Sequence, residues 1–175
     1  SQAYVMIRIE IMGIFEATLI LAAFLCSLVA GFLFAFAIVI MPGINNLNDR
    51  EFIRVFQVID GIIQNNQPIF MLVWVVSVLA LMASVALGIG QQDIAGRMLI
   101  ILSALIYLFG VQLPTIVINV PFNNKLQSLD IDAMNEASRK VARDNFESRW
   151  NRWNKIRTAL SSVASVLLII LVFRI

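Results

Sequence analysis

Residues 17–41 read ATLILAAFLCSLVAGFLFAFAIVIM, a continuous apolar run without a single charged residue. An α-helix needs roughly 20 apolar residues to cross the hydrocarbon core of a bilayer, which is about 30 Å thick. Residues 68–92 and 98–124 are also uncharged, and residues 158–173 form a shorter uncharged run. A chain of 175 residues is too small to bury four such helices on every face of a soluble core. The sequence therefore predicts an integral membrane protein.

The composition points the same way. Hydrophobic residues make up 60% of the chain and charged residues 14%, with a mean hydropathy of +0.87. Soluble domains are only about half apolar. The formal net charge of +2 is too small to indicate a nucleic-acid partner. We therefore expect the lipid bilayer to be the main partner of this chain.

We predict an all-α fold, a single membrane domain built as a four-helix bundle with spans at about residues 14–42, 68–90, 98–120 and 156–174. Small residues four positions apart favour close helix packing in lipid. Such stripes occur at Ala23, Ser27, Gly31 and Ala35, at Ala80, Ser84 and Gly88, and at Ser161 and Ser165. We interpret them as packing within the bundle rather than as a dimer face or ligand groove, so Gly31→Leu should disrupt folding. Pro114 lacks a backbone donor and predicts a kink in the third span.

Two further helices are predicted outside the membrane core. Residues 48–64 are amphipathic, with an apolar face of Phe52, Val55, Phe56, Ile59 and Ile63 and a polar face of Asp49, Arg50, Arg54, Gln57 and Asp60. This helix should lie on the membrane surface or cover the cytoplasmic end of the bundle. A second helix is expected at about residues 132–154, with Asp132 as its N-cap. It should run into the fourth span, either directly or with a bend near residues 151–154.

The distribution of positive charge predicts the orientation. Only three of the 13 Lys and Arg residues, Arg8, Arg97 and Arg174, fall on one side of the four spans. The positive-inside rule places the other side, with the two larger loops, in the cytoplasm. Both termini are then expected outside, in what is expected to be the cell (inner) membrane.

The residue types that hold metals or act as general bases are scarce. The chain has no histidine, and its single cysteine, Cys26, is expected to be a small apolar core residue. We therefore predict no metal and no cofactor. Within the spans Glu16 is the one candidate for a proton pathway, and we expect it to lie at the outer headgroups instead.

Amide side chains gather at the predicted cytoplasmic end of the bundle, and together with one arginine and two tryptophans they form the candidate binding site. The residues are Asn119, Asn123, Asn124, Trp150, Trp153, Asn154 and Arg157. Such a group can bind the polar or anionic head of a ligand whose apolar body lies between the helices. The alternative is that the amides and Arg157 cap helix ends or reach the lipid headgroups, while the tryptophans form an interfacial aromatic belt.

Two segments carry a family resemblance. Residues 119–126 read NVPFNNKL and residues 150–158 read WNRWNKIRT, and GFLFAF at residues 31–36 leads to Met41 and Pro42. From about residue 30 onward the chain resembles the anthrone-oxygenase-like family of small membrane proteins. The resemblance implies four spans and, in one branch of the family, oxidation of an anthrone to an anthraquinone by molecular oxygen with no evident cofactor.

For that chemistry the protein must hold a flat aromatic molecule, stabilise its oxyanion and supply a base. The resemblance implies that Arg157, Asn123 and Asn154 stabilise the oxyanion and that Trp150 or Trp153 stacks on the ring. The base is missing, because the chain has no histidine and no carboxylate lies within the two paired segments.

Three functions therefore remain open at the level of sequence. The first is this oxygenase, and the second is a non-catalytic protein that binds an aromatic, quinone-like or lipid molecule. The third is a structural or accessory subunit that docks onto a membrane-protein partner or a second copy of itself. An enzyme or binder should have an enclosed cavity beside Asn119, Asn123 and Arg157, whereas an accessory subunit should fill that region with its own side chains.

Overall fold

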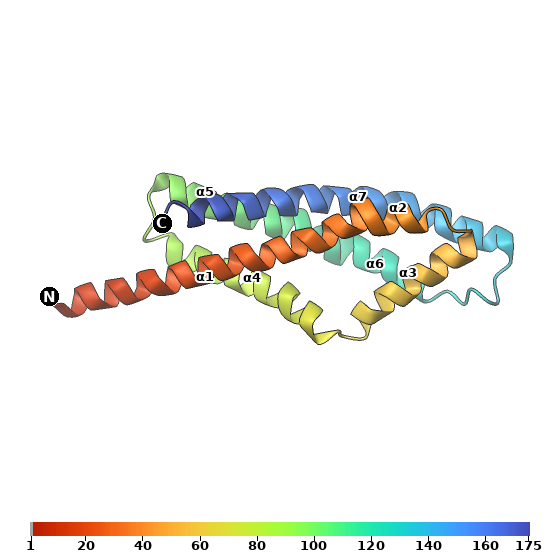
Figure 1. The fold of residues 1–175 in the computed structure, drawn as a ribbon, viewed down its shortest axis with the longest axis horizontal. Coiled ribbons are helices and arrows are strands. Elements are labelled where there is room, and N and C mark those ends of the chain that lie inside the picture. Colours follow the sequence, from red (N-terminus) through yellow and green to blue (C-terminus); the bar gives the residue numbers. More distant parts are fainter. Residues whose placement is uncertain (1) are drawn as a thin grey trace.

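The computed structural model of the protein describes residues 2–175, with the side chains of residue 10 and residues 13–175. The described chain is all-helical (Figure 1). Its elements are α1 (Gln2–Ala35), η1 (Phe36–Ile40), α2 (Met41–Ile44), α3 (Asp49–Gln64), α4 (Pro68–Gly88), α5 (Ile94–Tyr107), η2 (Leu108–Gln112), η3 (Thr115–Asn119), α6 (Val120–Gln127) and α7 (Glu136–Val172), where η marks a π-helical stretch.

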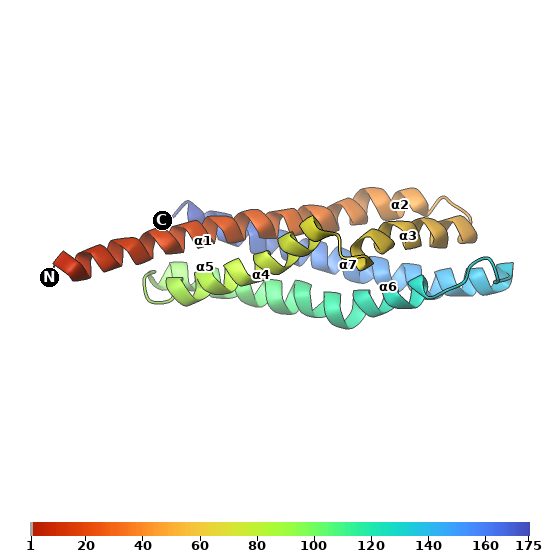
Figure 2. The same ribbon diagram turned by 90° about the horizontal axis from the view of Figure 1, so that it is seen from below.

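Four continuous helical segments of the described chain are long and apolar enough to cross a membrane. They are Gly13–Ile44, Pro68–Gly88, Ile94–Gln127 and Glu136–Val172. The predicted all-α membrane bundle is therefore confirmed. In the bundle α1 packs along α4 and α7, and α5 packs along α7 (Figures 1 and 2).

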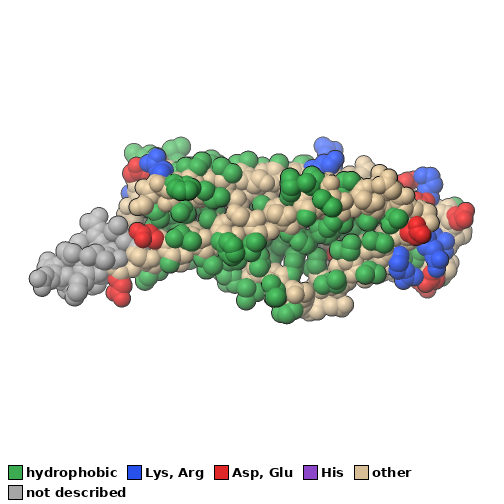
Figure 3. All heavy atoms as spheres, viewed as in Figure 1, with side chains coloured by type: hydrophobic (Ala, Val, Ile, Leu, Met, Phe, Trp, Pro, Cys, Tyr) green, Lys and Arg blue, Asp and Glu red, His purple; other side chains and the backbone are tan. Residues whose placement is uncertain are grey.

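Charged side chains are concentrated at one end of the bundle. Figure 3 shows hydrophobic side chains along its body, while most Lys, Arg, Asp and Glu side chains lie beyond them, at the end where α3 meets α7. The start of α1 and the end of α7 lie at the opposite end (Figure 1). This arrangement suits a bilayer around the body of the bundle. Which end faces the cytoplasm stays a prediction, and Arg8, which entered it, lies outside the described side chains.

Side-chain caps define where the helices begin. Asn48 Oδ1 accepts a hydrogen bond from the backbone N–H of Glu51 at 3.0 Å, and Asp93 Oδ1 accepts one from Gly96 at 2.7 Å. Asn135 caps α7 in the same way. The predicted N-cap at Asp132 is therefore wrong, because Asn135 takes that place. From Glu136 onward α7 runs to Val172 without a break, so the helix enters the fourth span directly.

The small-residue stripes are only partly at helix interfaces. Ala80, Ser84 and Gly88 are buried, and a Cβ added to Gly88 would lie 2.6 Å from Cε2 of Phe15. Gly31, in contrast, is exposed, and an added Cβ would meet nothing within 4 Å. The prediction that Gly31 lies in a tight helix contact is wrong. Ala23 of the same stripe is buried, but Gly31 itself points to the surroundings, so Gly31→Leu has room for the larger side chain.

The third span is irregular around Pro114. The π-helical stretches η2 and η3 lie on either side of this proline, where the regular helical hydrogen bonds are interrupted. Thr115 Oγ1 donates a hydrogen bond to the carbonyl of Val111 at 2.6 Å, and so serves one backbone acceptor near the break. The irregular backbone lies inside the membrane-spanning segment, where lipid offers no hydrogen bonds.

The amphipathic helix α3 covers one end of the bundle by packing on α6 and α7. Phe52 and Phe56 are buried as predicted, but so are Gln57 and Asp60, which we had assigned to the polar outer face. That assignment is wrong because α3 is covered on this side. Gln57 Nε2 donates to the carbonyls of Leu126 at 2.9 Å and Leu129 at 3.0 Å, which compensates its burial.

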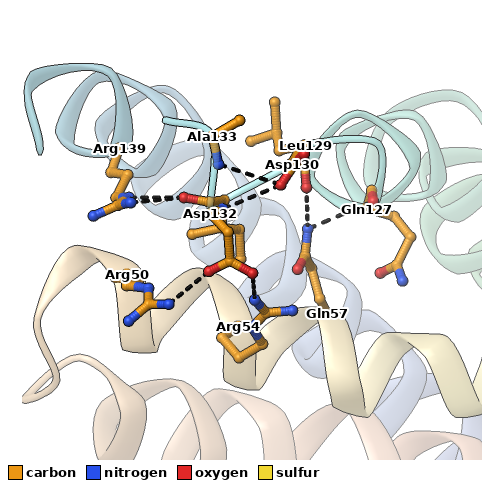
Figure 4. A network of polar contacts seen from close by, with 10 residues as sticks. Arg50, Arg54, Gln57, Gln127, Leu129, Asp130, Asp132, Ala133 and Arg139 are labelled. Atoms are coloured by element: carbon orange, nitrogen blue, oxygen red, sulfur yellow. Dashed lines mark hydrogen bonds and ion pairs between the residues drawn. The ribbon is translucent and has the colours of Figure 1, made fainter. Parts of the chain in front are cut away.

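The loop before α7 is tied to α3 by charge. Arg50 and Arg54 donate to the two carboxylate oxygens of Asp132 at 2.6 and 2.7 Å (Figure 4). These guanidinium groups hold the pKa of Asp132 below its ordinary value. Arg139 donates twice to the carbonyl of Ile131 at 2.8 and 3.0 Å. Together these contacts hold the loop against α3, the helix that carries Asp60.

Candidate functional site

A cavity of about 250 Å³ lies at the junction of two apolar clusters. One cluster fills the middle of the bundle, and the other lies between α3, α7 and the η1 and α2 segments that follow α1. Leu33 belongs to the first and Phe36 to the second, and both line the cavity. The cavity also reaches α4, where the chain turns sharply after α3; Asn66 enables this turn with a positive φ of 57°.

Aromatic rings form much of the cavity wall. The lining rings are Phe32, Phe36, Phe56, Phe70, Trp74 and Trp150. The rings of Phe70 and Trp74 are stacked with centroids 5.2 Å apart, and Phe70 meets Phe32 edge to face at the same distance. Phe56 meets Trp150 edge to face at 5.4 Å. A pocket with such walls favours a flat apolar ligand.

Arg157 brings a positive charge to this apolar cavity. Its side chain is 3% exposed, and it forms no ion pair with any described residue. Nη1 donates to Thr115 Oγ1 at 2.8 Å and Nη2 donates to Asn154 Oδ1 at 3.0 Å. Both partners are neutral, and Nε has no partner among the described residues. A buried guanidinium that no carboxylate contacts is costly, so the part of the cavity next to Arg157 is electrostatically suited to an anion.

Two amides support this part of the wall. Asn154 Nδ2 donates to the carbonyl of Leu33 at 3.1 Å, which leaves its Oδ1 to orient Arg157. Asn119 Nδ2 donates to the carbonyl of Trp150 at 3.5 Å, a long contact. Asn119 is 2% exposed, and its Oδ1 has no donor among the described residues. Asn119 therefore places a buried acceptor without a donor in the wall of the cavity.

Asp60 is a lining residue that the sequence analysis did not propose. Its carboxylate is 4% exposed and accepts hydrogen bonds from Asn123 Nδ2 at 2.8 Å and from Gln64 Nε2 at 2.6 Å. Asn123 Oδ1 in turn accepts from Trp150 Nε1 at 2.7 Å. Burial raises the pKa of the Asp60 carboxyl, and the hydrogen bonds from Gln64 and Asn123 oppose that rise.

Most of the predicted site residues lie around this cavity. Asn119, Asn123, Trp150, Asn154 and Arg157 line it. The other two predicted residues, Asn124 and Trp153, do not line it.

Asn124 and Trp153 lie away from the cavity. Asn124 is exposed and accepts from Gln64 Nε2 at 3.2 Å, while Trp153 is partly buried on another face of α7. The two tryptophans are three residues apart, but only Trp150 faces the aromatic cluster.

The sequence of this chain matches one known protein family. Residues 61–167, more than half of the sequence, match the family described as "Anthrone oxygenase". The chain belongs to the anthrone oxygenase family. Neither the curated proteins nor the solved structures give a match.

The match covers only part of the cavity wall. In this member of the anthrone oxygenase family, the match includes the lining residues of α4, η3, α6 and α7. Asn119, Asn123 and Arg157 are among them. The lining residues of α1 and η1 lie before the matched region, as do Phe56 and Asp60 of α3, and Asp60 precedes the first matched residue by one. Family membership therefore carries no information about Asp60, which is known to line the cavity only from the fold.

No strong sequence signal marks Asp60. It is one of several charged residues on an amphipathic helix, and hydrophobic periodicity does not reveal which edge of the polar face a later segment covers. The one hint is the spacing to Gln64, four residues on, which lets the two side chains meet on one helix face.

The cavity combines the groups needed to stabilise and to generate an anion. Arg157 is a fixed cationic donor, Asn119 Oδ1 is an open acceptor, and Asp60 is a carboxylate with a raised pKa. Among the described residues, Arg157 and Asp60 are the only ionisable groups in the lining. A neutral ligand that becomes an anion when it loses a proton suits this pair.

Proposed function

We propose that this protein is an oxygenase without a bound cofactor, which oxidises a hydroxylated anthrone to the corresponding anthraquinone with molecular oxygen. The observation that carries the proposal is Arg157, a buried guanidinium in an aromatic cavity with no carboxylate partner among the described residues. Membership of the anthrone oxygenase family supports the substrate class.

The role of Arg157 follows from the charge of the reacting molecule. An anthrone has a carbonyl on one side of its central ring and a methylene group on the other. Removal of a methylene proton puts negative charge on the carbonyl oxygen, where a guanidinium binds it more strongly than it binds the neutral ketone. Since that difference lowers the barrier to proton loss, Arg157 promotes formation of the reactive anion.

The walls of the cavity match the remainder of such a molecule. The rings of Phe70, Trp74 and Phe56 offer flat and edge contacts to a fused aromatic system. Asn119 Oδ1 accepts a hydrogen bond from a ring hydroxyl, which satisfies an atom that is otherwise buried without a partner. These contacts support a hydroxylated polycycle over a single-chain lipid.

The reaction then balances without an added reductant. The anthrone anion gives one electron to oxygen, and the resulting radicals combine to form a carbon–oxygen bond, giving a peroxide at the former methylene carbon. The second hydrogen on that carbon leaves as a proton while the oxygen–oxygen bond breaks and releases hydroxide. One anthrone and one oxygen molecule give one anthraquinone and one water.

A binding experiment tests the site directly. The protein in lipid nanodiscs is titrated with an anthraquinone that bears an ionised hydroxyl, and quenching of tryptophan fluorescence reports binding beside Trp74 and Trp150. Arg157→Met should weaken binding by about 10- to 100-fold, the range expected for a lost charge-assisted hydrogen bond. Arg152→Met, a matched control on an exposed position of the same helix, should bind as the wild type does. Equal affinity in all three proteins contradicts the proposal.

An accessory role is the competing function. It expects the region beside Asn119, Asn123 and Arg157 to be filled by the chain's own side chains, whereas a cavity of about 250 Å³ lies there. The cavity supports a ligand-binding role. Binding of the anthraquinone without turnover of the anthrone would leave the second alternative, a non-catalytic aromatic or quinone-like binder.

A further inference from the structure

We infer that Asp60 is the general base that removes the methylene proton of the bound substrate. This inference rests on the proposed function and supplies the base that the motif residues lack. Asp60 comes from α3, a helix outside the membrane-spanning segments, and reaches the same cavity as Arg157 of α7.

The two charges in the cavity are kept apart. Asp60 and Arg157 are both almost fully buried and line one cavity, yet they form no ion pair with each other. Opposite charges in a medium of low dielectric constant attract strongly, so side chains free to meet would pair. Here each is held by neutral amides instead, Asp60 by Asn123 and Arg157 by Asn154. A ligand in the cavity that both side chains line can therefore contact the two charges separately.

The shape of the substrate places its two reacting groups far apart. The carbonyl oxygen and the methylene carbon of an anthrone lie on opposite sides of its central ring. A molecule held with its oxygen at Arg157 presents its methylene group across the cavity, where a base is needed. Asp60 is the only carboxylate that the described part of the chain contributes to the lining.

The carboxylate oxygens of Asp60 keep free acceptor positions. An ionised carboxylate has about four lone-pair sites. Asn123 and Gln64 each donate to one oxygen of Asp60 and fix its orientation. A lone pair on either oxygen remains for a carbon-bound proton. Burial of Asp60 also raises its pKa, which makes the carboxylate a stronger base than an exposed aspartate.

The proton transfers return Asp60 to its ionised form at the end of each turnover. Asp60 takes the first methylene proton while the electron pair of the carbon–hydrogen bond moves to the oxygen at Arg157. Protonated Asp60 returns this proton to the peroxide formed with oxygen. Asp60 then accepts the second proton from the same carbon as the oxygen–oxygen bond breaks, and passes it to the departing hydroxide to form water.

Exchange of hydrogen for deuterium tests this step apart from oxidation. The wild-type protein in nanodiscs is incubated with anthrone in deuterated buffer without oxygen, and mass spectrometry follows deuterium entry at the methylene group. We expect wild-type protein to accelerate the exchange and Asp60→Asn to lose about 100-fold or more of that acceleration, in the range typical of general-base catalysis. Glu51→Gln, an exposed carboxylate on the same helix, is the matched control and should exchange at the wild-type rate.

Further readouts separate a base from a structural residue. Asp60→Asn should still bind the anthraquinone within about threefold of wild type, because it keeps the size of the side chain, and formate should restore exchange to Asp60→Ala. A folded Asp60→Asn protein that exchanges at the wild-type rate overturns the inference. If neither variant folds, the pH dependence of deuterium exchange by the wild-type protein decides. A rate that falls on acidification, as expected for a single carboxyl group, supports Asp60 as the base. A protein-dependent rate that does not fall on acidification overturns the inference.

The outcomes also separate this inference from the proposed function. Exchange by wild-type protein that depends on Asp60, with no oxygen uptake under air, supports the base and contradicts the oxygenase. Oxygen uptake that is unaffected in Asp60→Asn supports the oxygenase and contradicts the base. Absence of both exchange and uptake in the wild type contradicts both.

Discussion

The buried side chains of Asp60 and Arg157 line the same cavity with opposite charges and do not pair with each other. Each is instead hydrogen-bonded to neutral groups, at 2.8 Å between Asp60 and Asn123 and at 3.0 Å between Arg157 and Asn154. Unpaired buried charges lower the stability of a fold, so both side chains are better explained by a ligand than by folding.

Removal of the Arg157 charge should therefore not destabilise the protein. Arg157→Met keeps much of the apolar stem and removes the uncompensated guanidinium. We expect a melting temperature in detergent equal to or higher than that of the wild type, together with the loss of anthraquinone binding described above. A lower melting temperature would instead show that the hydrogen bonds of Arg157 to Thr115 and Asn154 are structural.

Turnover should depend on the ionisation of Asp60. Only the carboxylate form accepts a proton, so the rate should fall as the pH drops through the pKa of Asp60. Burial raises this pKa above the ordinary 3.8, and the midpoint should therefore lie above that value. Arg157 is the only other ionisable group that the described residues place in the lining, and it stays charged across the acidic and neutral range. Lys125 is the one charged residue of the neighbouring α6.

Steady-state oxygen uptake between about pH 4 and pH 9 measures this profile, over the range in which carboxyl groups and histidines ordinarily titrate. Asp60→Asn should remove the acid limb together with most of the rate. An acid limb of unchanged midpoint in a folded Asp60→Asn protein would assign it to another group.

Two glycines should respond oppositely to the same substitution. Gly88→Ala puts a methyl group 2.6 Å from the ring of Phe15, which is buried and cannot move away easily. Overpacking of this kind costs about 1–3 kcal/mol. Gly31→Ala meets nothing within 4 Å and should gain up to about 1 kcal/mol from helix propensity. Unfolding in mixed micelles measures both changes; equal effects would contradict the packing described for α1 and α4.

Arg143 should hold the loop after α2 to α7. It is mostly buried and donates to the carbonyls of Asn45 and Leu47, both at 2.8 Å, with its guanidinium 4.4 Å from the ring centre of Phe52. Arg143→Ala should cost about 2 kcal/mol of folding stability, the scale of a charge-assisted hydrogen bond.

Lys140→Ala serves as the control for Arg143, because Lys140 forms an exposed ion pair with Asp144 and should change stability little. A similar loss in both variants would mean that charge alone, and not the buried contacts of Arg143, stabilises this region.

The sequence was sufficient for the fold but not for the whole site. Four uncharged runs determine the bundle, because lipid requires long apolar helices and little else produces them. Arg157 and Asn119 were identified because polar groups next to such runs are conspicuous. Asp60 was not, since its burial depends on the docking of α3 and on the loop that Asp132 ties to it, contacts between residues about 80 positions apart.

The error at Gly31 has a related cause. A small residue on a membrane helix can face a neighbouring helix or lipid, and the stripe pattern is the same in both cases. Gly88 and Gly31 occupy equivalent places in their stripes, yet only Gly88 contacts another helix. The packing partner of each face is set by the arrangement of the bundle, which no local pattern encodes.

The most direct test of the account follows the oxygen atoms. Wild-type protein in nanodiscs is given a hydroxylated anthrone under ¹⁸O₂, and the product is weighed by mass spectrometry, with spontaneous oxidation measured in the absence of protein. The account predicts rapid formation of an anthraquinone that carries one labelled oxygen, with the second labelled atom in water, and a rate near the spontaneous level for Arg157→Met. Formation of the quinone at the spontaneous rate in the presence of wild-type protein, or a quinone without the label, would contradict it.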